Sequence, residues 1–181
     1  MIKAILFDFN ATLICAPEWM ALETRTLPQD AFRLLASQGH VDPLSRKQLL
    51  KADETFQLAR KTANLTNRET SHVVDLIAVI DALGYQQAVS HFLAEETVTI
   101  LQRRCVPNVS LMAEVETTLK RLLATGFQLG IISNAAYSPF LIWTLEHFRV
   151  LSLFEEVVVS ADVGIRKPSL EIFRTTLDSM R

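Results

Sequence analysis

The sequence predicts an α/β fold with a parallel sheet, into which a long helical segment is inserted. Short apolar runs typical of buried strands occur at residues 2–7, 127–132 and 154–159. Helical patterns follow the second and third runs. Between the first two runs, residues 17–104 show helical periodicity and almost no strand signal. This order favours a layered sheet that carries a separate helical bundle.

Composition places the chain among ordinary globular proteins. It has 181 residues, of which 49% are apolar and 21% are charged. Its formal charge of −2 gives no reason to expect nucleic acid or an anionic membrane as a partner, and it favours a small-molecule ligand or no ligand. Cys15 and Cys105 have no metal-ligand spacing, and no signal peptide or membrane-length apolar run is present. We therefore expect a cytoplasmic protein, and the oligomeric state stays open.

The first strand ends on a carboxylate. Asp8 follows the apolar run, residues 9–12 suit a tight loop, and Leu13 and Ile14 return to apolar packing. Asp8 either caps the next element or lies at the carboxyl edge of the sheet, where open α/β folds bind ligands.

The inserted segment reads as four helices. Pro28 and the turn at residues 39–43 interrupt the first part, and a helix begins at Ser45. Two further helices are expected at residues 69–83 and 86–104. Three arginines of this segment are expected on a solvated face, with a bidentate contact to a substrate carboxylate as the alternative: Arg25, Arg33 and Arg60.

The remainder returns to alternating strands and helices. A helix is expected at residues 111–124, and the strand that follows ends in Ser133-Asn134. Another helix spans residues 138–148, and the third strand leads into Gly164-Ile-Arg-Lys-Pro168. Ser169 begins the last helix.

Three polar residues thus follow three strands: Asp8, Ser133 and Lys167. Right-handed crossovers bring the carboxyl ends of parallel strands to one edge, so these side chains can face one ligand. Such a set suits a phosphate monoester. The carboxylate is ionised at neutral pH and can act as a nucleophile without a base. Its repulsion from the phosphate anion would be offset by the lysine ammonium, by the serine hydroxyl with the neighbouring backbone N–H groups, and by Mg²⁺.

These residues resemble the haloacid dehalogenase (HAD) superfamily of aspartate-nucleophile hydrolases. Its first motif, Asp-x-Asp-Gly-Thr-Leu after a strand, is matched by Asp8-Phe-Asn-Ala-Thr-Leu13. Its second, a strand that ends in Ser or Thr, is matched by Ile131-Ile-Ser-Asn134, and its third, Gly-x-x-Lys-Pro, by Gly164-Ile-Arg-Lys-Pro168. The helical insert resembles the α-helical cap of this family.

The resemblance implies a Rossmann-like, three-layer parallel sheet made of residues 1–14 and 106–181, with residues 15–105 as an all-α cap. It also implies a Mg²⁺-dependent phosphatase of small phosphate esters. Asp8 would form an aspartyl-phosphate and, with the backbone carbonyl of Asn10, would hold Mg²⁺. Ser133 and Asn134 would bind phosphoryl oxygens, and Lys167 would steady the anion and the nucleophile.

The sequence departs from the family pattern at two residues of the first motif. Asn10 replaces the second Asp, the proton donor of the family's phosphatases, and an amide cannot exchange protons in that way. Ala11 replaces the usual Gly, which is tolerable if the backbone there does not need a positive φ.

The family's fourth motif, an acidic strand end that completes the metal shell, is not seen after the Ser169 helix. We therefore expect an incomplete sequence or a natural short form, weak Mg²⁺ binding and slow hydrolysis. Two alternatives stay open. One is 2-haloacid dehalogenation, which needs no metal, and the other is a catalytically weak protein that acts by binding.

Overall fold

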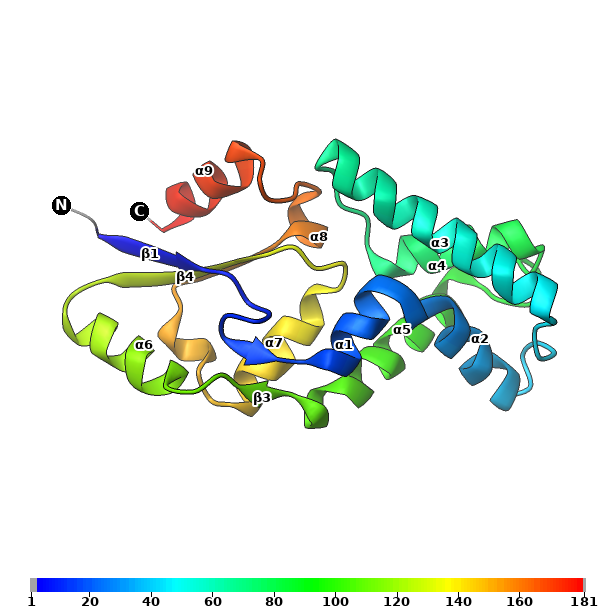
Figure 1. Cartoon of the computed structure of the whole chain (residues 1–181), viewed down its shortest axis with the longest axis horizontal. Coiled ribbons are helices and arrows are strands. Elements are labelled where there is room, and N and C mark those ends of the chain that lie inside the picture. The colour runs from blue at the N-terminus through cyan, green and yellow to red at the C-terminus, as the bar shows by residue number, and fades with distance from the viewer. Residues whose placement is uncertain (1–2, 181) are drawn as a thin grey trace.

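A parallel sheet of three strands organises one end of the molecule (Figure 1). The computed structural model describes residues 3–180. The strands run in the order β1-β4-β5, with bounds β1 Ala4–Phe7, β4 Gln128–Ser133 and β5 Glu156–Val159. Phe7 pairs with Ile131, and Ser133 pairs with Val159. The carboxyl ends of all three strands therefore lie at one edge of the sheet.

Helices cover both faces of this sheet and make three layers (Figure 1). On one face lie α6 (Val115–Ala124) and α7 (Ser138–His147), and on the other lies α9 (Leu170–Ser179). The short helix α8 (Ser160–Val163) directly follows β5. This arrangement confirms the predicted α/β fold with a parallel sheet.

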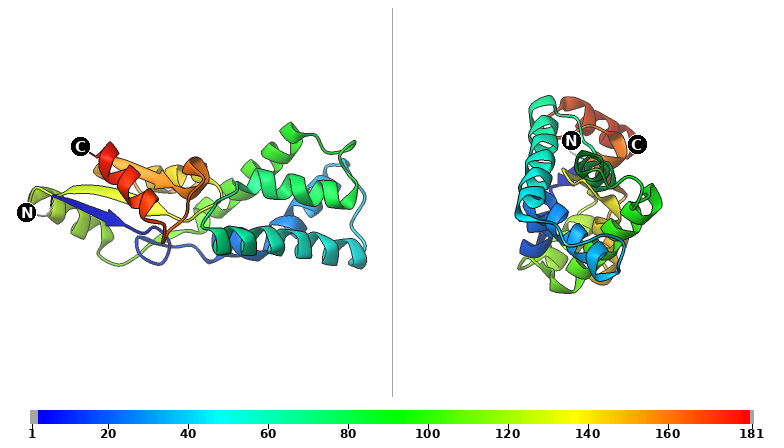
Figure 2. Two further views of the ribbon diagram at one scale, coloured as in Figure 1. Left: turned by 90° about the horizontal axis from the view of Figure 1, so that it is seen from above. Right: turned by 90° about the vertical axis from the view of Figure 1, so that its right-hand side faces the viewer.

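The helical segment extends away from one end of the sheet (Figure 2). We call residues 17–105 the cap. Its helices are α1 (Pro17–Ala21), the π-helical turn η1 (Leu22–Thr26), α2 (Leu27–Ser37), α3 (Arg46–Thr66), α4 (His72–Leu83) and α5 (His91–Cys105). Serines cap three of these helices, because Ser45, Ser71 and Ser90 each accept a hydrogen bond from a backbone N–H of the first turn. The predicted boundaries of the cap at residues 15 and 105 stay a prediction.

A short two-stranded ladder joins the two places where the chain enters and leaves the cap. Strand β2 (Ile14–Cys15) pairs antiparallel with β3 (Ser110–Leu111). A short 3₁₀ turn, η2 (Val106–Asn108), links α5 to β3, and a similar turn, η3 (Leu151–Leu153), precedes β5. Two-residue strands carry no periodicity, so this ladder was beyond the reach of the sequence patterns.

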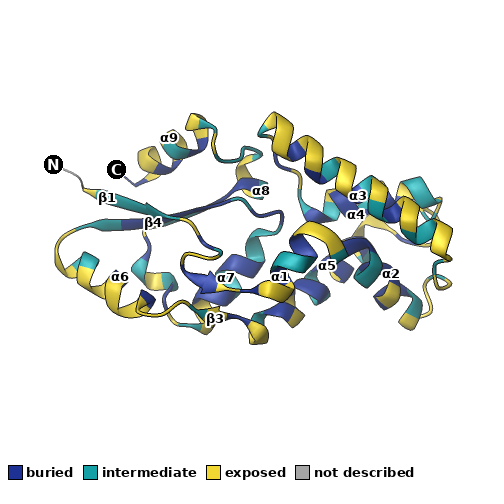
Figure 3. Ribbon diagram, viewed as in Figure 1, coloured by how far each residue is buried: buried dark blue, intermediate teal, exposed yellow. Residues whose placement is uncertain are grey.

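One hydrophobic cluster runs through the sheet region and the cap. At the junction the ring of Trp19 on α1 stacks on Phe140 of α7 at 4.6 Å, and Phe9 meets Trp19 edge-on at 6.0 Å. All three side chains are buried, and buried residues concentrate around this junction in Figure 3. The cap is therefore packed onto the sheet region through large aromatic surfaces.

Several predicted elements differ from the structure at their ends. The helix expected from residue 111 begins at Val115, because β3 takes residues 110–111. The helix expected from residue 86 begins at His91. Every residue of β1 is only partly buried, since β1 lies at an edge of the described sheet, so the expectation of a strand buried on both faces holds better for β4.

Among residues 3–180, no helix has both the length and the apolar character that crossing a membrane requires.

The loop after β1 contains a residue in the left-handed region. The carbonyl of Phe9 accepts hydrogen bonds from the N–H groups of Leu13 and Ile14, and the N–H of Ala11 donates to the carbonyl of Ile14 at 2.8 Å. This closed turn gives Ala11 a φ of +59°. The condition under which Ala would replace Gly without strain is thus not met, because a Cβ disfavours this conformation.

We expect Ala11→Gly to raise the free energy of unfolding by about 1 kcal/mol, because glycine relieves the left-handed strain at this position. Urea denaturation measures the change. The matched control is Ala78→Gly in the middle of α4, where an exposed alanine lies in a regular helix. That substitution should lower stability by about 0.5–1 kcal/mol. Equal effects at the two positions would contradict the role of backbone strain at Ala11.

Candidate active site

The structure brings the carboxylate that follows β1 into contact with the ammonium of Lys167. The Nζ of Lys167 donates a hydrogen bond to the Oδ1 of Asp8 and another to the backbone carbonyl of Ile132 at 2.6 Å. The Asp8 side chain is about half-exposed, at 48%, whereas Lys167 is 22% exposed. The pair is therefore open to a ligand on the Asp8 side and anchored on the Lys167 side.

Asn134 fixes the backbone of Lys167. The side-chain Oδ1 of Asn134 accepts the Lys167 N–H at 2.8 Å, and its Nδ2 donates to the Lys167 carbonyl at 3.0 Å. Both ends of this amide are thus engaged with the loop that carries the lysine. The structure gives Asn134 a positioning role, and its direct contact with phosphoryl oxygens stays a prediction.

Ser133 lies at the end of β4, next to the carbonyl that anchors Lys167, and only 3% of it is exposed. Two of the backbone N–H groups that follow it are already occupied. Ala135 donates to the Oγ of Ser160 at 3.0 Å, and Ala136 donates to the carboxylate of Glu23 at 3.1 Å. The expectation that the N–H groups near Ser133 bind the substrate therefore does not extend to these two.

A metal ion has few oxygen ligands available at this edge. Among residues 3–180, no group of three or more His, Cys, Asp or Glu side chains is arranged to hold one. Asp8 offers a half-exposed carboxylate, and within the same residues the carbonyl of Asn10 takes part in no hydrogen bond. Both are the hard oxygen donors that Mg²⁺ accepts, with water and substrate in the other positions. The donor set fits Mg²⁺ and predicts weak affinity.

A buried carboxylate joins the cap to the lysine loop. Glu69, in the connection between α3 and α4, accepts hydrogen bonds from Arg60 of the cap at 2.7 Å, from Ser160 at 2.7 Å, and from Arg166 beside Lys167. The N–H of Glu69 also donates to the carbonyl of Gly164 at 3.1 Å. The cap thus holds the loop that carries Lys167.

The prediction that Arg60 lies on a solvated face is wrong. Only 9% of Arg60 is exposed, and its Nε lies 3.2 Å from a carboxylate oxygen of Asp75 on α4. Its two carboxylate partners stand on other segments, so nothing in the local pattern around Arg60 indicated burial. Burial raises the pKa of Asp75, although Arg60 opposes this shift.

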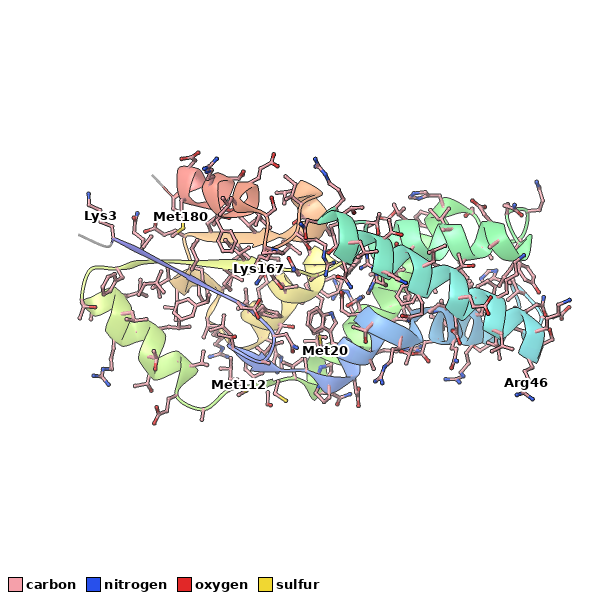
Figure 4. The ribbon with its side chains drawn as sticks, turned by 45° about the horizontal axis from the view of Figure 1, so that its top comes forward. Lys3, Met20, Arg46, Met112, Lys167 and Met180 are labelled. Atoms are coloured by element: carbon pink, nitrogen blue, oxygen red, sulfur yellow. The ribbon has the colours of Figure 1, made fainter. Side chains whose placement is uncertain are left out.

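A pocket of about 380 Å³ lies where the cap meets this edge of the sheet. Asn134 and Arg166 line it from the sheet side, whereas Asp8, Ser133 and Lys167 are not among its lining residues. Figure 4 labels Met20, which lines the pocket, and Lys167, which does not. Its cap-side lining residues are Met20, Glu23, Thr24, Gln57, Arg60, Lys61, Asn64 and Leu65.

Two titratable side chains have strongly shifted pKa values: Glu23, which lines this pocket, and His72, which lies 3.7 Å from Glu23. Burial raises the pKa of Glu23 on η1 from 4.5 to about 7. Burial lowers the pKa of His72 on α4 from 6.5 to about 4, so this histidine is neutral near pH 7. His72 is fully buried. No sequence motif marks Glu23, and its environment appears only once the cap is folded.

Comparisons with known proteins agree with this fold. A family model described as haloacid dehalogenase-like hydrolase matches residues 5–181. A search of curated proteins found no match.

Solved structures share the fold at low sequence identity. A 2-haloacid dehalogenase from Pseudomonas syringae pv. Tomato has a TM-score of 0.67 and 23% identity, over 98% of this chain and 72% of that one. A HAD phosphatase from Thermococcus onnurineus has a TM-score of 0.57 and 22% identity, over 99% and 72% of the two chains. A HAD hydrolase from Bacillus subtilis, bound to magnesium, has a TM-score of 0.56 and 19% identity, over 98% and 72%.

We expect Glu69→Gln to lower the free energy of unfolding by roughly 3 kcal/mol, because it leaves the buried Arg60 and Arg166 without a shared countercharge. Urea denaturation measures the change. The matched control is Glu54→Gln, at an exposed position of α3, which should stay within about 0.5 kcal/mol of the wild type. Indistinguishable stabilities of the two variants would contradict the role of Glu69 at this junction.

The raised pKa of Glu23 predicts a pH-dependent stability. The folded state retains a proton that the unfolded state releases between pH 4.5 and about 7, so this contribution is present below pH 4.5 and is lost as pH rises through 7. Glu23→Gln removes the titration. Relative to the wild type, the variant should therefore gain on the order of 1–3 kcal/mol between pH 5 and pH 8.

Chemical denaturation at several pH values measures this difference. His72 contributes in the opposite sense, with stability lost as pH falls through 4. Because His72 lies 3.7 Å from Glu23, the comparison includes any change that the substitution makes at this histidine. A difference that does not vary between pH 5 and pH 8 would show that Glu23 titrates normally.

Proposed function

Because this chain belongs to the family of haloacid dehalogenase-like hydrolases, we propose that it hydrolyses small phosphate monoesters through an aspartyl-phosphate on Asp8. The observation that carries the proposal is the contact between Asp8 and Lys167 beside the end of β4. This contact joins a carboxylate that can act as a nucleophile to a cation. Asn134, which binds the backbone of Lys167, lines the pocket beside the pair.

Asp8 attacks the phosphorus atom, and Lys167 offsets the repulsion between the two anions. Two unit charges about 4 Å apart repel by on the order of 4 kcal/mol at an effective dielectric of 20, which is a large part of a reaction barrier. The Lys167 ammonium donates a hydrogen bond to the carbonyl of Ile132, and the Asn134 side chain makes two hydrogen bonds to the Lys167 backbone. The ammonium is therefore positioned before substrate binds. Ser133 would bind a phosphoryl oxygen.

Mg²⁺ is the cofactor that we propose, held by the carboxylate of Asp8 and the backbone carbonyl of Asn10. When bound, it would neutralise charge on the phosphoryl oxygens. The small donor set supports weak affinity, so millimolar rather than micromolar Mg²⁺ should be needed for saturation.

The second candidate is hydrolysis of a 2-haloacid, in which Asp8 attacks carbon. The observation in its favour is Asn10, because displacement of a halide ion needs no proton donor for the leaving group. The structural similarity to a dehalogenase concerns the fold, which the HAD phosphatase shares. A protein that retains the pocket and acts by binding alone is the third possibility.

We expect Asp8→Asn to abolish Mg²⁺-dependent release of phosphate from p-nitrophenyl phosphate, because an amide is not a nucleophile. The variant should also lose the thermal stabilisation that phosphate with Mg²⁺ gives the wild type. The matched control is Asp42→Asn, at an exposed position in the loop before α3, which should leave both readouts unchanged.

The same protein samples separate the candidates. Chloride release from 2-chloropropionate without added metal, lost in Asp8→Asn, would replace the phosphatase by the dehalogenase. Thermal stabilisation by phosphate, without hydrolysis of p-nitrophenyl phosphate or 2-chloropropionate, would favour the third possibility, a protein that acts by binding.

A further inference from the structure

Glu23 is a carboxyl group in the pocket beside the candidate site. It belongs to the π-helical turn η1 and lines the 380 Å³ pocket together with Asn134 and Arg166. Its Oε2 accepts the N–H of Ala136, three residues after Ser133, at 3.1 Å. Its Oε1 has no hydrogen-bond partner among the described residues, although Glu23 is only 7% exposed. A buried carboxyl oxygen without a donor is unusual and points to a ligand or a proton.

The charged groups around Glu23 leave it without a counterion of its own. Arg60 of α3 and Arg166 of the lysine loop face it, but Glu69 binds both arginines. His72 of α4 lies 3.7 Å from Oε1 and is neutral near pH 7. With a pKa of about 7, the Glu23 carboxyl can both give and take a proton at neutral pH, which is the condition for efficient acid–base catalysis.

A chain of contacts relates Glu23 to the nucleophile. The amide of Asn134 binds the backbone of Lys167, whose ammonium contacts Asp8. Asn134 also lines the same pocket as Glu23. Asp8 and Lys167 do not line this pocket, so a substrate with its phosphoryl group at Asp8 would have to extend its leaving group past Asn134 to reach Glu23. Asn10 has no exchangeable carboxyl proton to offer on the other side.

We propose that Glu23 is the proton-transfer residue of this enzyme and takes the part for which Asn10 is unsuited. This inference rests on the proposed phosphatase activity. The carboxyl of Glu23 gives its proton to the bridging oxygen of the ester as that P–O bond breaks and the bond between phosphorus and Asp8 forms. The Glu23 carboxylate then takes a proton from the water that attacks phosphorus, while the bond between phosphorus and Asp8 breaks.

Two substrates with different leaving groups test the first step. Nitrophenolate leaves p-nitrophenyl phosphate without a proton, whereas the alkoxide of ethyl phosphate requires one. In single-turnover experiments, Glu23→Gln should slow cleavage of ethyl phosphate by 10²–10⁴-fold and change the burst of nitrophenol less than 10-fold. The wild-type rate with ethyl phosphate should fall as pH rises through 7, and the rate of Glu23→Gln should not.

A rescue experiment separates proton transfer from a structural role. Adding Asn10→Asp to Glu23→Gln should restore at least a tenth of the lost rate with ethyl phosphate, because it returns a carboxyl group to the reacting oxygen. Glu18→Gln, at an exposed position of α1, is the matched control and should behave as the wild type.

The outcomes distinguish the two proposals. Phosphate release that survives Asp8→Asn would overturn the phosphatase proposal and this one with it. Release that depends on Asp8 but falls equally with both esters in Glu23→Gln, or that Asn10→Asp does not rescue, would overturn only the role of Glu23.

Discussion

The parallel register of three strands is the constraint on which the candidate site depends. Asp8 and Lys167 lie 159 positions apart in the chain, and they meet because β1, β4 and β5 end at the same edge. A shift of one residue in any pairing would turn the alternating side chains to the opposite face and misplace the loops that follow. Gly130 helps to keep this arrangement, since a Cβ there would lie 2.8 Å from Leu6 and 2.9 Å from the sulfur of Met180.

Some polar groups at the junction of the cap and the sheet region hold other protein groups in place, and others keep atoms that are free to bind a ligand. Asn134 and Glu69 form their hydrogen bonds within the protein. Asn134 binds the backbone of Lys167, and Glu69 binds Arg60, Arg166 and Ser160. Asp8 and Glu23 each keep an oxygen outside such arrangements. Reactive groups that stand among rigid supports lose little freedom when substrate binds.

Much of the fold could be predicted from the sequence, because apolar runs and helical periodicity mark the long elements. The same runs indicate Asp8, Ser133 and Lys167 as candidate site residues, and the structure brings Asp8 and Lys167 into contact. Sequence could not indicate the ladder of β2 and β3, which is too short for a pattern. It also missed the burial of Arg60 and the environment of Glu23, because their partners come from distant segments and exist only after folding.

The cap is attached to the sheet region at several places, among them the stacked rings of Trp19 and Phe140 and the hydrogen bonds of Glu69. A cap attached at a single point could rotate about that point as about a hinge, whereas additional contacts with the sheet region oppose the rotation. Any opening of the helices away from the sheet must separate Glu69 from Arg166 and expose both charges to solvent or leave them uncompensated. An opening of this kind would therefore break the same contact that holds the Lys167 loop.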